Sequence, residues 1–221
     1  MKKLCLLVVV VLSAVASKAQ KEVLLQVPVT GNRALDFVPK GYDTLGTAVG
    51  DLNKDGKSDM VIAVFNVKKE EKPGEDEVPR ILIVAFNTGS GYRTVFKGDN
   101  LLLCKQCGGM FGDPYAGVYI DKGVLSISHY GGSSWRWSID QKFRFQNNDF
   151  YLIGRTDQTL QVNAACAENV DEGPGRYEDV NLVTGKRIYK EISDDCKVVA
   201  DKTEKIKVKP LVKMADTKII D

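Results

Sequence analysis

Histidine is almost absent from this chain. His129 is the single histidine among 221 residues. Any mechanism that needs an imidazole must therefore use this side chain. The sequence also lacks a G-x-S-x-G segment to frame a serine nucleophile, so a catalytic triad would depend on proximity alone. In "VLSISHY", His129 shares a strand face with Leu125 and Ile127, which predicts a hydrogen-bonded core or edge position and makes catalysis the weaker hypothesis.

Long apolar runs are lacking after residue 19, where no stretch approaches the roughly 18 residues that a membrane-spanning helix needs. The first 19 residues contain two early lysines, then a short apolar run, then small residues at Ser17 and Ala19. This layout predicts a secretory signal over 1–19 and a mature chain that starts at Gln20. We therefore expect an exported protein, periplasmic or extracellular, without a membrane span.

A charge surplus of either sign is missing from the mature chain. Removal of the signal takes away three lysines and no acidic residue, which leaves 28 basic and 29 acidic side chains and a net charge near −1. This balance provides no electrostatic basis for binding nucleic acid or an anionic membrane surface.

Cysteine is sparse, and the number of cysteines in the predicted mature chain is even. Cys5 lies at the start of the apolar run, where lipid attachment is not expected, and Cys104, Cys107, Cys166 and Cys196 remain after export. Four cysteines in an exported chain predict up to two disulfides, with three pairings open. "CKQC" also allows a redox dithiol or half of a zinc site. However, the other two cysteines form no second close pair and "GGMFGDP" is a poor helix start, so structural bridges or inert thiols are favoured.

Strand patterns dominate the chain. "LGTAVGDL", "MVIAVFNV", "RILIVAF" and "YRTVF" predict four short antiparallel strands, with the charged segment 68–79 as a solvated hairpin loop. Residues 123–154 predict a three-stranded meander, because the odd positions of 135–145 are mainly aromatic or apolar. Residues 164–178 are expected to form a loop, and "VNLVTGKRIYKEI" a hairpin that turns at 184–186. The segment 205–221 contains Pro210 and is expected to be at best a frayed edge strand.

The segment "DLNKDGKSD" carries the clearest chemistry. Asp51, Asn53 and Asp55 alternate, Lys57 can offer a backbone carbonyl, and Asp59 follows two residues later. Calcium prefers six to eight oxygen ligands, which a loop supplies from alternate positions around a glycine. The spacing therefore predicts a structural calcium site, with a hydrated polar turn as the alternative.

An EF-hand is excluded, because its twelfth position requires glutamate and this chain has Ile62 there. The segments "GDLNKDGKSDMVIAV" and "ILIVAFNTGSGYRTVF", over about residues 42–96, resemble the FG-GAP/VCBS repeat, the blade unit of integrin-like β-propellers. The N-x-G-x-G element of that repeat matches at Asn87, Gly89 and Gly91. The resemblance implies that the aspartates of the acidic loop bind calcium.

A full propeller is not expected, because four or more blades are needed and one acidic loop is present. The predicted fold is all-β: an antiparallel blade-like sheet, with the calcium-type loop, packed with the antiparallel aromatic meander. The expected organisation is a signal at 1–19, an N-terminal segment at 20–41, the repeat at 42–100, the meander at 101–197 and a C-terminal tail at 198–221. "GGMFGDPYAGVYI", "HYGGSSWRW" and "FRFQNNDFYLIG" also resemble uncharacterised exported bacterial proteins, which implies no activity.

Two functional hypotheses follow. The first is a calcium-binding, non-enzymatic binding module of the bacterial cell envelope, with an unknown protein or carbohydrate ligand. The second is a small envelope hydrolase that uses His129 or a pair among Asp113, Asp121 and Asp140, with the "HYGGSSW" and "FGDPY" turns lining its cleft. A sugar-stacking role for Tyr130 and the two tryptophans, Trp135 and Trp137, is the lesser alternative to packing in the core.

Overall fold

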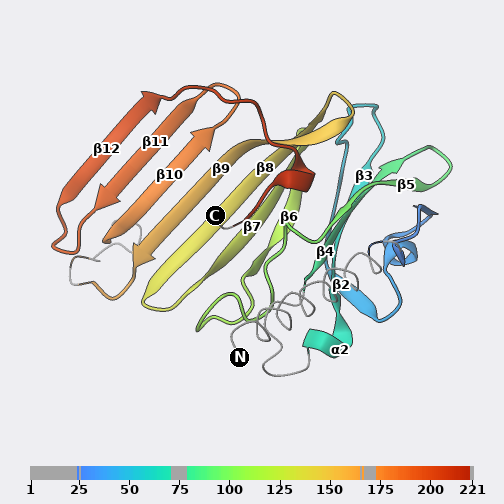
Figure 1. The fold of residues 1–221 in the computed structure, drawn as a ribbon, viewed down its shortest axis with the longest axis horizontal. Coiled ribbons are helices and arrows are strands. Elements are labelled where there is room, and N and C mark those ends of the chain that lie inside the picture. The colour runs from blue at the N-terminus through green and yellow to red at the C-terminus, as the bar shows by residue number, and fades with distance from the viewer. Residues whose placement is uncertain (1–23, 25, 71–78, 165, 167–172, 220–221) are drawn as a thin grey trace, which may run out of the picture.

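The computed structural model describes residues 24, 26–70, 79–164, 166 and 173–219, so the predicted signal peptide and Gln20 lie outside it. The described chain is all-β and forms two antiparallel sheets, as the sequence predicts (Figure 1). The elements in order are β1 (Thr30–Gly31), η1 (Ala34–Phe37), β2 (Tyr42–Gly50), β3 (Asp59–Asn66), α2 (Val67–Glu70), β4 (Ile81–Asn87), β5 (Tyr92–Gly98), β6 (Tyr115–Asp121), β7 (Val124–Gly132), β8 (Trp135–Gln146), β9 (Asp149–Gln161), β10 (Gly175–Asn181), β11 (Lys186–Ile192), β12 (Val198–Lys205) and η3 (Met214–Asp216).

The first sheet has the strand order β1-β5-β4-β3-β2 and contains the four strands predicted from residues 42–96. Its central strands β3 and β4 are apolar on both faces and almost completely buried. One face is covered by the N-terminal segment, through Val27 and Phe37. The other face packs against the second sheet. Burial on both faces explains why the sequences of these strands are continuous apolar runs.

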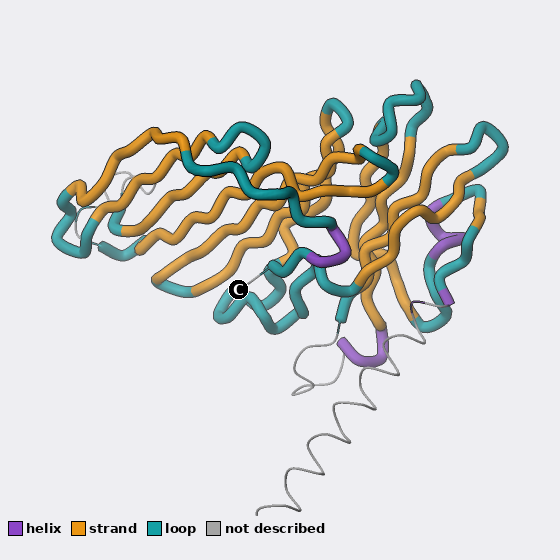
Figure 2. The backbone as a smooth tube through the Cα atoms, turned by 45° about the horizontal axis from the view of Figure 1, so that its top comes forward, coloured by secondary structure: helices purple, strands orange, loops and turns teal. Residues whose placement is uncertain are grey.

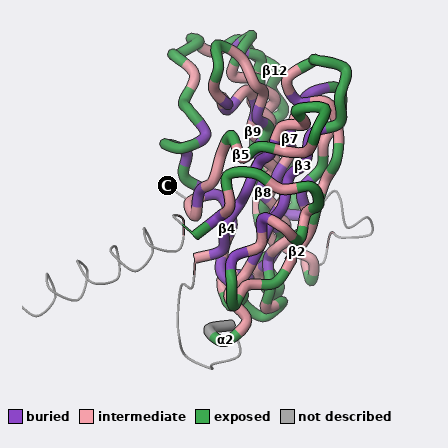
Figure 3. The backbone as a smooth tube through the Cα atoms, turned by 90° about the vertical axis from the view of Figure 1, so that its right-hand side faces the viewer, coloured by how far each residue is buried: buried purple, intermediate pink, exposed green. Residues whose placement is uncertain are grey.

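The second sheet is a meander of seven strands in the order β12-β11-β10-β9-β8-β7-β6. Its core side is formed by β6 to β9, where Leu125, Ile127, Phe143 and Phe150 pack against the first sheet. No residue of β10, β11 or β12 is buried. Figure 3 shows this change from a buried centre to an exposed end around β12.

The exposed end of the second sheet is held by cross-strand charge pairs rather than by a core. Arg187 of β11 bonds Glu178 of β10 at 2.7 Å and Glu204 of β12 at 2.6 Å. Its guanidinium carbon also lies 4.6 Å from the ring centroid of Tyr189. These contacts join three neighbouring strands on one face.

Several element bounds differ from the predictions. Strand β9 continues seven residues beyond the predicted "FYLIG" segment, and β10 begins at Gly175 inside the predicted loop 164–178. Both additions are polar because they belong to the exposed end of the sheet, where no apolar alternation is required. The hairpin that turns between β10 and β11 is confirmed. The predicted loop 68–79 begins within α2, and residues 71–78 lie outside the described chain.

The expectation of a frayed edge strand over 205–221 is wrong for its described part. After β12 the chain runs back to the centre of the molecule, as Figure 2 shows. There the Leu152 amide donates to the Val212 carbonyl at 2.9 Å, and the Asn100 side-chain amide donates to the Thr217 carbonyl at 2.8 Å. Met214 is fully buried. Met214 therefore joins the core, whereas Val208 and Val212 of the same segment are exposed.

Two disulfides are present, and they resolve the pairing that the sequence left open. Cys104 is bonded to Cys107, and Cys166 is bonded to Cys196. The second bridge ties the loop after β9 to the turn between β11 and β12. Both bridges are typical of an oxidising, extracytoplasmic environment. None of the described helices is long and apolar enough to cross a membrane.

Candidate functional site

The acidic loop connects β2 to β3, and Asp59 anchors it. Asp59 is fully buried, and its carboxylate accepts hydrogen bonds from the backbone amides of Leu52 at 2.9 Å, Asn53 at 3.3 Å and Asn87 at 2.9 Å. Burial raises the pKa of Asp59, and the hydrogen bonds oppose this shift. This carboxylate therefore joins the acidic loop to the end of β4.

The other predicted ligands surround the backbone of the same loop. The Asp55 amide donates to Asp51 Oδ1 at 3.1 Å and to Asn53 Oδ1 at 3.0 Å, and Asp51 Oδ2 accepts from the amide of Gly56 at 2.9 Å. The Lys57 ammonium lies 3.2 Å from Asp55 Oδ2. Gly56 has a φ of +83°, as the predicted tight turn requires.

These residues offer calcium the correct atom type, and each carboxylate oxygen that accepts one N–H retains a second lone pair. Within the described ranges, however, no three acidic, histidine or cysteine side chains converge in a metal-holding arrangement. The side-chain oxygens of Asp51, Asn53 and Asp55 accept hydrogen bonds from backbone amides of the loop itself, and the buried carboxylate of Asp59 accepts from amides on both sides of it. The calcium site at these residues and the Lys57 carbonyl therefore stays a prediction.

The two segments that resemble the FG-GAP/VCBS repeat contact each other. The Asn87 side-chain amide donates to the Ser58 carbonyl at 3.2 Å, and its oxygen accepts from the Gly89 amide at 2.8 Å. Gly89 and Gly91 both have positive φ values, 87° and 139°. The N-x-G-x-G element thus forms the turn against which the acidic loop packs.

His129 occupies a hydrogen-bonded core position, as the sequence predicts. Only 1% of the residue is exposed, and its Nε2 accepts a hydrogen bond from the Leu103 amide at 3.2 Å. Burial and the nearby charge of Arg80 lower its pKa to about 4, although Asp113 opposes the shift. An imidazole buried in this way is not placed to act on a substrate.

The three carboxylates of the hydrolase hypothesis have different surroundings. Asp113 forms two hydrogen bonds with Arg80, at 2.7 and 2.6 Å. Asp140 accepts a hydrogen bond from the Ser128 hydroxyl. Asp121 pairs in register with Val124, at the opposite end of β7 from Gly132. Four residues of strand separate Asp121 from Asp140, about 13 Å at 3.3 Å per residue. This exceeds the separations of catalytic carboxylate pairs.

The prediction that both tryptophans pack in the core is wrong. The inward alternation of β8 holds at Ile139, Gln141 and Phe143, which are buried. Trp135 is 43% exposed, and Trp137 is only partly buried. The strand extends beyond the first sheet at this end, so its inward positions there have no core to enter.

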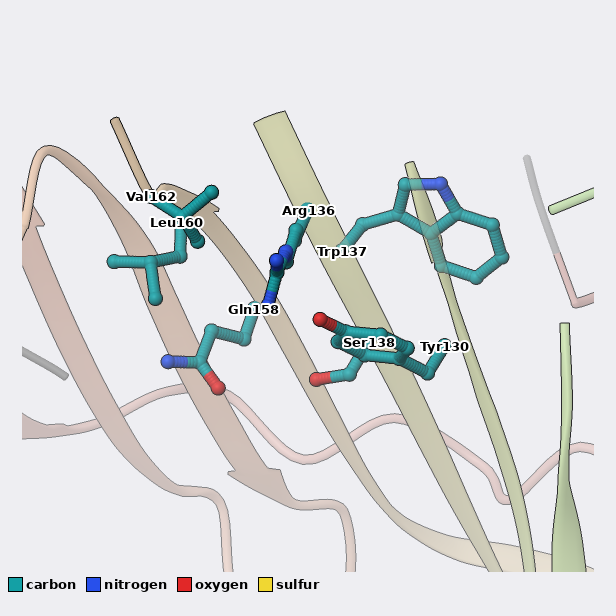
Figure 4. A pocket seen from close by; sticks show the side chains of 7 residues that line it. All are labelled: Tyr130, Arg136, Trp137, Ser138, Gln158, Leu160 and Val162. Carbon is teal, nitrogen blue, oxygen red and sulfur yellow. The ribbon is translucent and has the colours of Figure 1, made fainter. Parts of the chain in front are cut away.

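A pocket of about 180 Å³ opens at this end of the second sheet (Figure 4). Tyr130, Ser138 and Gln158 are opposite one another on β7, β8 and β9, and Arg136 and Leu160 are opposite one another two residues along. Since side chains alternate along a strand, all five share the face away from the core. Figure 4 shows both hydroxyls and the amide near one space, with the Trp137 indole directed away. The lining is Tyr130, Arg136, Trp137, Ser138, Gln158, Leu160 and Val162.

The turn at 108–114 forms one side of this region. The Phe111 ring lies 5.7 Å from the Tyr130 ring and 4.9 Å from the Arg136 guanidinium carbon. The Gly132 amide donates to the Gly108 carbonyl and the Tyr130 amide donates to the Pro114 carbonyl, both at 2.8 Å, so the "FGDPY" and "HYGGSSW" segments are in contact. A Cβ at Gly131 would lie 2.8 Å from the Gly108 carbonyl, so glycine is required for this approach.

Sequence reasoning missed Phe111, Arg136 and Gln158 as parts of one site. Arg136 occupies the polar phase of β8, and Gln158 belongs to the polar extension of β9 that was not predicted. Only the alternation of β8 could have placed Arg136 on the outer face. The three residues lie close together because of the strand register and the position of the turn that carries Phe111.

Comparisons with known proteins give little further information. No family model matches the chain, and no curated protein is significantly similar to it in sequence. A solved structure described as that of a Xanthomonas type IV secretion system related protein aligns with a TM-score of 0.31 and 13% identity, over 73% of this chain and 58% of that one. The present chain therefore spans little more than half of that protein. The resemblance to FG-GAP/VCBS repeats depends on the two motif segments alone.

Proposed function

We propose that this protein is an exported, non-enzymatic binding module of the bacterial cell envelope. The pocket on the outer face of β7, β8 and β9 supports this proposal, because it combines apolar walls with a few convergent polar groups. Two links constrain the turn that carries Phe111, namely the Cys104–Cys107 disulfide and the Arg80–Asp113 ion pair. A preorganised surface binds with a smaller entropy cost than a mobile one.

We further propose that the acidic loop binds calcium as a structural ion and that the first sheet is a blade-type sheet of the FG-GAP/VCBS kind. The ion would lie far from the pocket. Gly123, in the turn before β7, approaches the Asp51 carbonyl, whereas Tyr130 is near the other end of that strand. Seven residues of strand correspond to about 23 Å. Calcium would therefore stabilise the scaffold without contacting the ligand.

The hydrolase alternative has weaker support. His129 is buried behind the pocket scaffold, and Asp113 is paired with Arg80. A general acid or base must come within hydrogen-bond reach of its substrate, and these groups are not placed to do so.

The proposal is tested by a binding screen of the chain from Gln20 onward. Immobilised protein is presented with a panel of envelope oligosaccharides and purified envelope proteins, beside the pocket variant Tyr130→Ala/Gln158→Ala and the control Thr203→Ala on β12. We expect a ligand that wild type and control retain, that the pocket variant loses, and that mass spectrometry recovers unchanged. Equal retention by the pocket variant would remove the pocket from the proposal. Recovery of a cleaved ligand would instead favour the hydrolase.

A further inference from the structure

Among the described residues that line the pocket, Arg136 alone is charged. Its Nε is buried and has no hydrogen-bond partner within the described part of the chain. The guanidinium is held in place by the Phe111 ring, 4.9 Å away. A guanidinium presents several N–H donors in one plane, which matches the two oxygens of a carboxylate. Since Arg136 forms no ion pair within the described part of the chain, the positive charge that it brings to the pocket indicates an anionic ligand.

The remaining lining is suited to a ring that carries hydroxyl groups. Tyr130 and Ser138 provide hydroxyls and Gln158 provides an amide, so this row can both donate and accept hydrogen bonds. Leu160 and Val162 form an apolar wall beside it, as Figure 4 shows. A sugar ring has the same division, with apolar C–H surfaces and a polar rim.

The size of the pocket and its single charge further restrict the classes of ligand that it can bind. Its volume of about 180 Å³ is below the roughly 300–1,000 Å³ of pockets for drug-sized molecules, so it accommodates one ring. One guanidinium neutralises one negative charge, which suits a carboxylate better than a dianionic phosphate. The Tyr130 side chain and the Gln158 amide beside the arginine also favour a sugar over a simple anion.

We propose that the pocket binds one carboxylated sugar, a uronic acid residue of an acidic polysaccharide. Its carboxylate pairs with Arg136, and its hydroxyls contact Tyr130, Ser138 and Gln158. This inference rests on the proposed binding function and specifies its ligand class. It assigns to Phe111 the role of positioning the Arg136 guanidinium.

The test compares each of three uronates, glucuronate, galacturonate and mannuronate, with its parent hexose. Each pair differs only in a carboxylate that replaces a hydroxymethyl group. Binding to the chain from Gln20 onward is measured by NMR titration at low salt. We expect at least one uronate to bind about tenfold more tightly than its hexose, as a charge-assisted pair implies. The inference is overturned if no pair shows a preference for the acid.

Two variants on β8 assign the effect to the pocket. Arg136→Gln should reduce uronate binding to the hexose level, whereas Lys142→Gln, which removes a charge from the exposed outer face of the same strand, should change it little. Near-UV circular dichroism verifies folding of each variant. If Arg136→Gln does not fold, Arg136→Lys retains the charge without the planar fork, and we expect it to weaken uronate binding. An unchanged affinity in a folded Arg136 variant contradicts the inference.

Other outcomes separate this inference from the proposed function. Equal binding of hexose and uronate that is lost in Tyr130→Ala would refute the acidic ligand and support a binding module. Selective binding of an N-acetylated dipeptide through its terminal carboxylate, without sugar binding, would also overturn the inference. The proposal that the pocket is a binding site would then remain supported. Failure of every sugar, together with full panel binding by Tyr130→Ala/Gln158→Ala, would overturn the inference and remove the pocket from the proposed function, while a binding module without this pocket would still be supported.

Discussion

The buried guanidinium of Arg80 holds the carboxylate of Asp113 through two hydrogen bonds, 2.7 and 2.6 Å long. Arg80 directly precedes β4 of the first sheet, and Asp113 lies in the turn before β6 of the second. This ion pair therefore joins the two sheets and fixes the turn that carries Phe111. Burial works to raise the pKa of Asp113, but the bonds from Arg80 and the Tyr115 amide outweigh it, so the pKa is lowered overall.

Asp113→Asn should destabilise the protein, because it removes the negative charge beside a buried guanidinium. Loss of one partner from a buried pair costs about 3–5 kcal/mol. Asp113 is one-third exposed, so we expect about 2–3 kcal/mol in urea unfolding, since water compensates part of the loss. The exposed Asp201→Asn is the matched control. A change below about 0.5 kcal/mol would show that the pair does not support the fold.

His129 should make stability depend on pH between about 6.5 and 4. Its pKa is about 4 in the folded protein, because burial disfavours the charged form, and about 6.5 when unfolded. The unfolded chain takes up the proton first, so the contribution of His129 is complete above pH 6.5 and is lost as the pH falls towards 4. The expected loss between pH 7 and pH 5 is about 2 kcal/mol.

This prediction is checked by urea unfolding of wild type and His129→Gln at pH 7 and pH 5. Glutamine offers an oxygen to the Leu103 amide but does not titrate, so the variant should lack this part of the pH dependence. Other titrating groups contribute equally to both proteins. Equal pH dependence in the two proteins would refute the assigned pKa.

Calcium should raise the melting temperature of the chain from Gln20 onward relative to excess EDTA. With a dissociation constant near 10⁻⁴ M and about 2 mM calcium, linkage predicts about 1.8 kcal/mol, or several degrees for a chain of this size. Asp55→Ala should lose the shift, and Asp201→Asn should retain it. If calcium has no effect on wild type, "DLNKDGKSD" is a polar turn and the resemblance to the repeat loses its functional content.

The two disulfides should contribute differently. The Cys166–Cys196 bridge closes a loop of 30 residues, and Cys104–Cys107 closes one of three. Chain entropy predicts stabilisation of about 3–4 kcal/mol from the first and about 2 kcal/mol from the second. Urea unfolding of the two paired Cys→Ser variants tests this order. We expect Cys104→Ser/Cys107→Ser to weaken ligand binding as well, because this bridge constrains the turn that carries Phe111. Unchanged binding would contradict that role.

Prediction from sequence succeeded where burial leaves a periodic pattern. The sequence predicted β3 and β4 from their apolar runs, and β8 from its alternation from Ile139 onward. These patterns arise because contact with the core selects the side chains there. The core or edge position predicted for His129 followed from the alternation of β7, where it shares a face with Leu125 and Ile127. The polar extension of β9 and all of β12 were not predicted, since a strand segment without a fully buried face does not need apolar residues.

By itself the sequence determined an all-β chain, the position and the oxygen-rich composition of the acidic loop, and an even set of four cysteines in the predicted mature protein. These properties are local, because they depend on side-chain alternation, turn residues and composition. Only the tertiary structure decided the disulfide pairing, the union of Arg80 with Asp113, and the meeting of Phe111, Arg136 and Gln158. Such contacts join residues distant in the chain through strand register and sheet packing, and no short segment encodes those relationships.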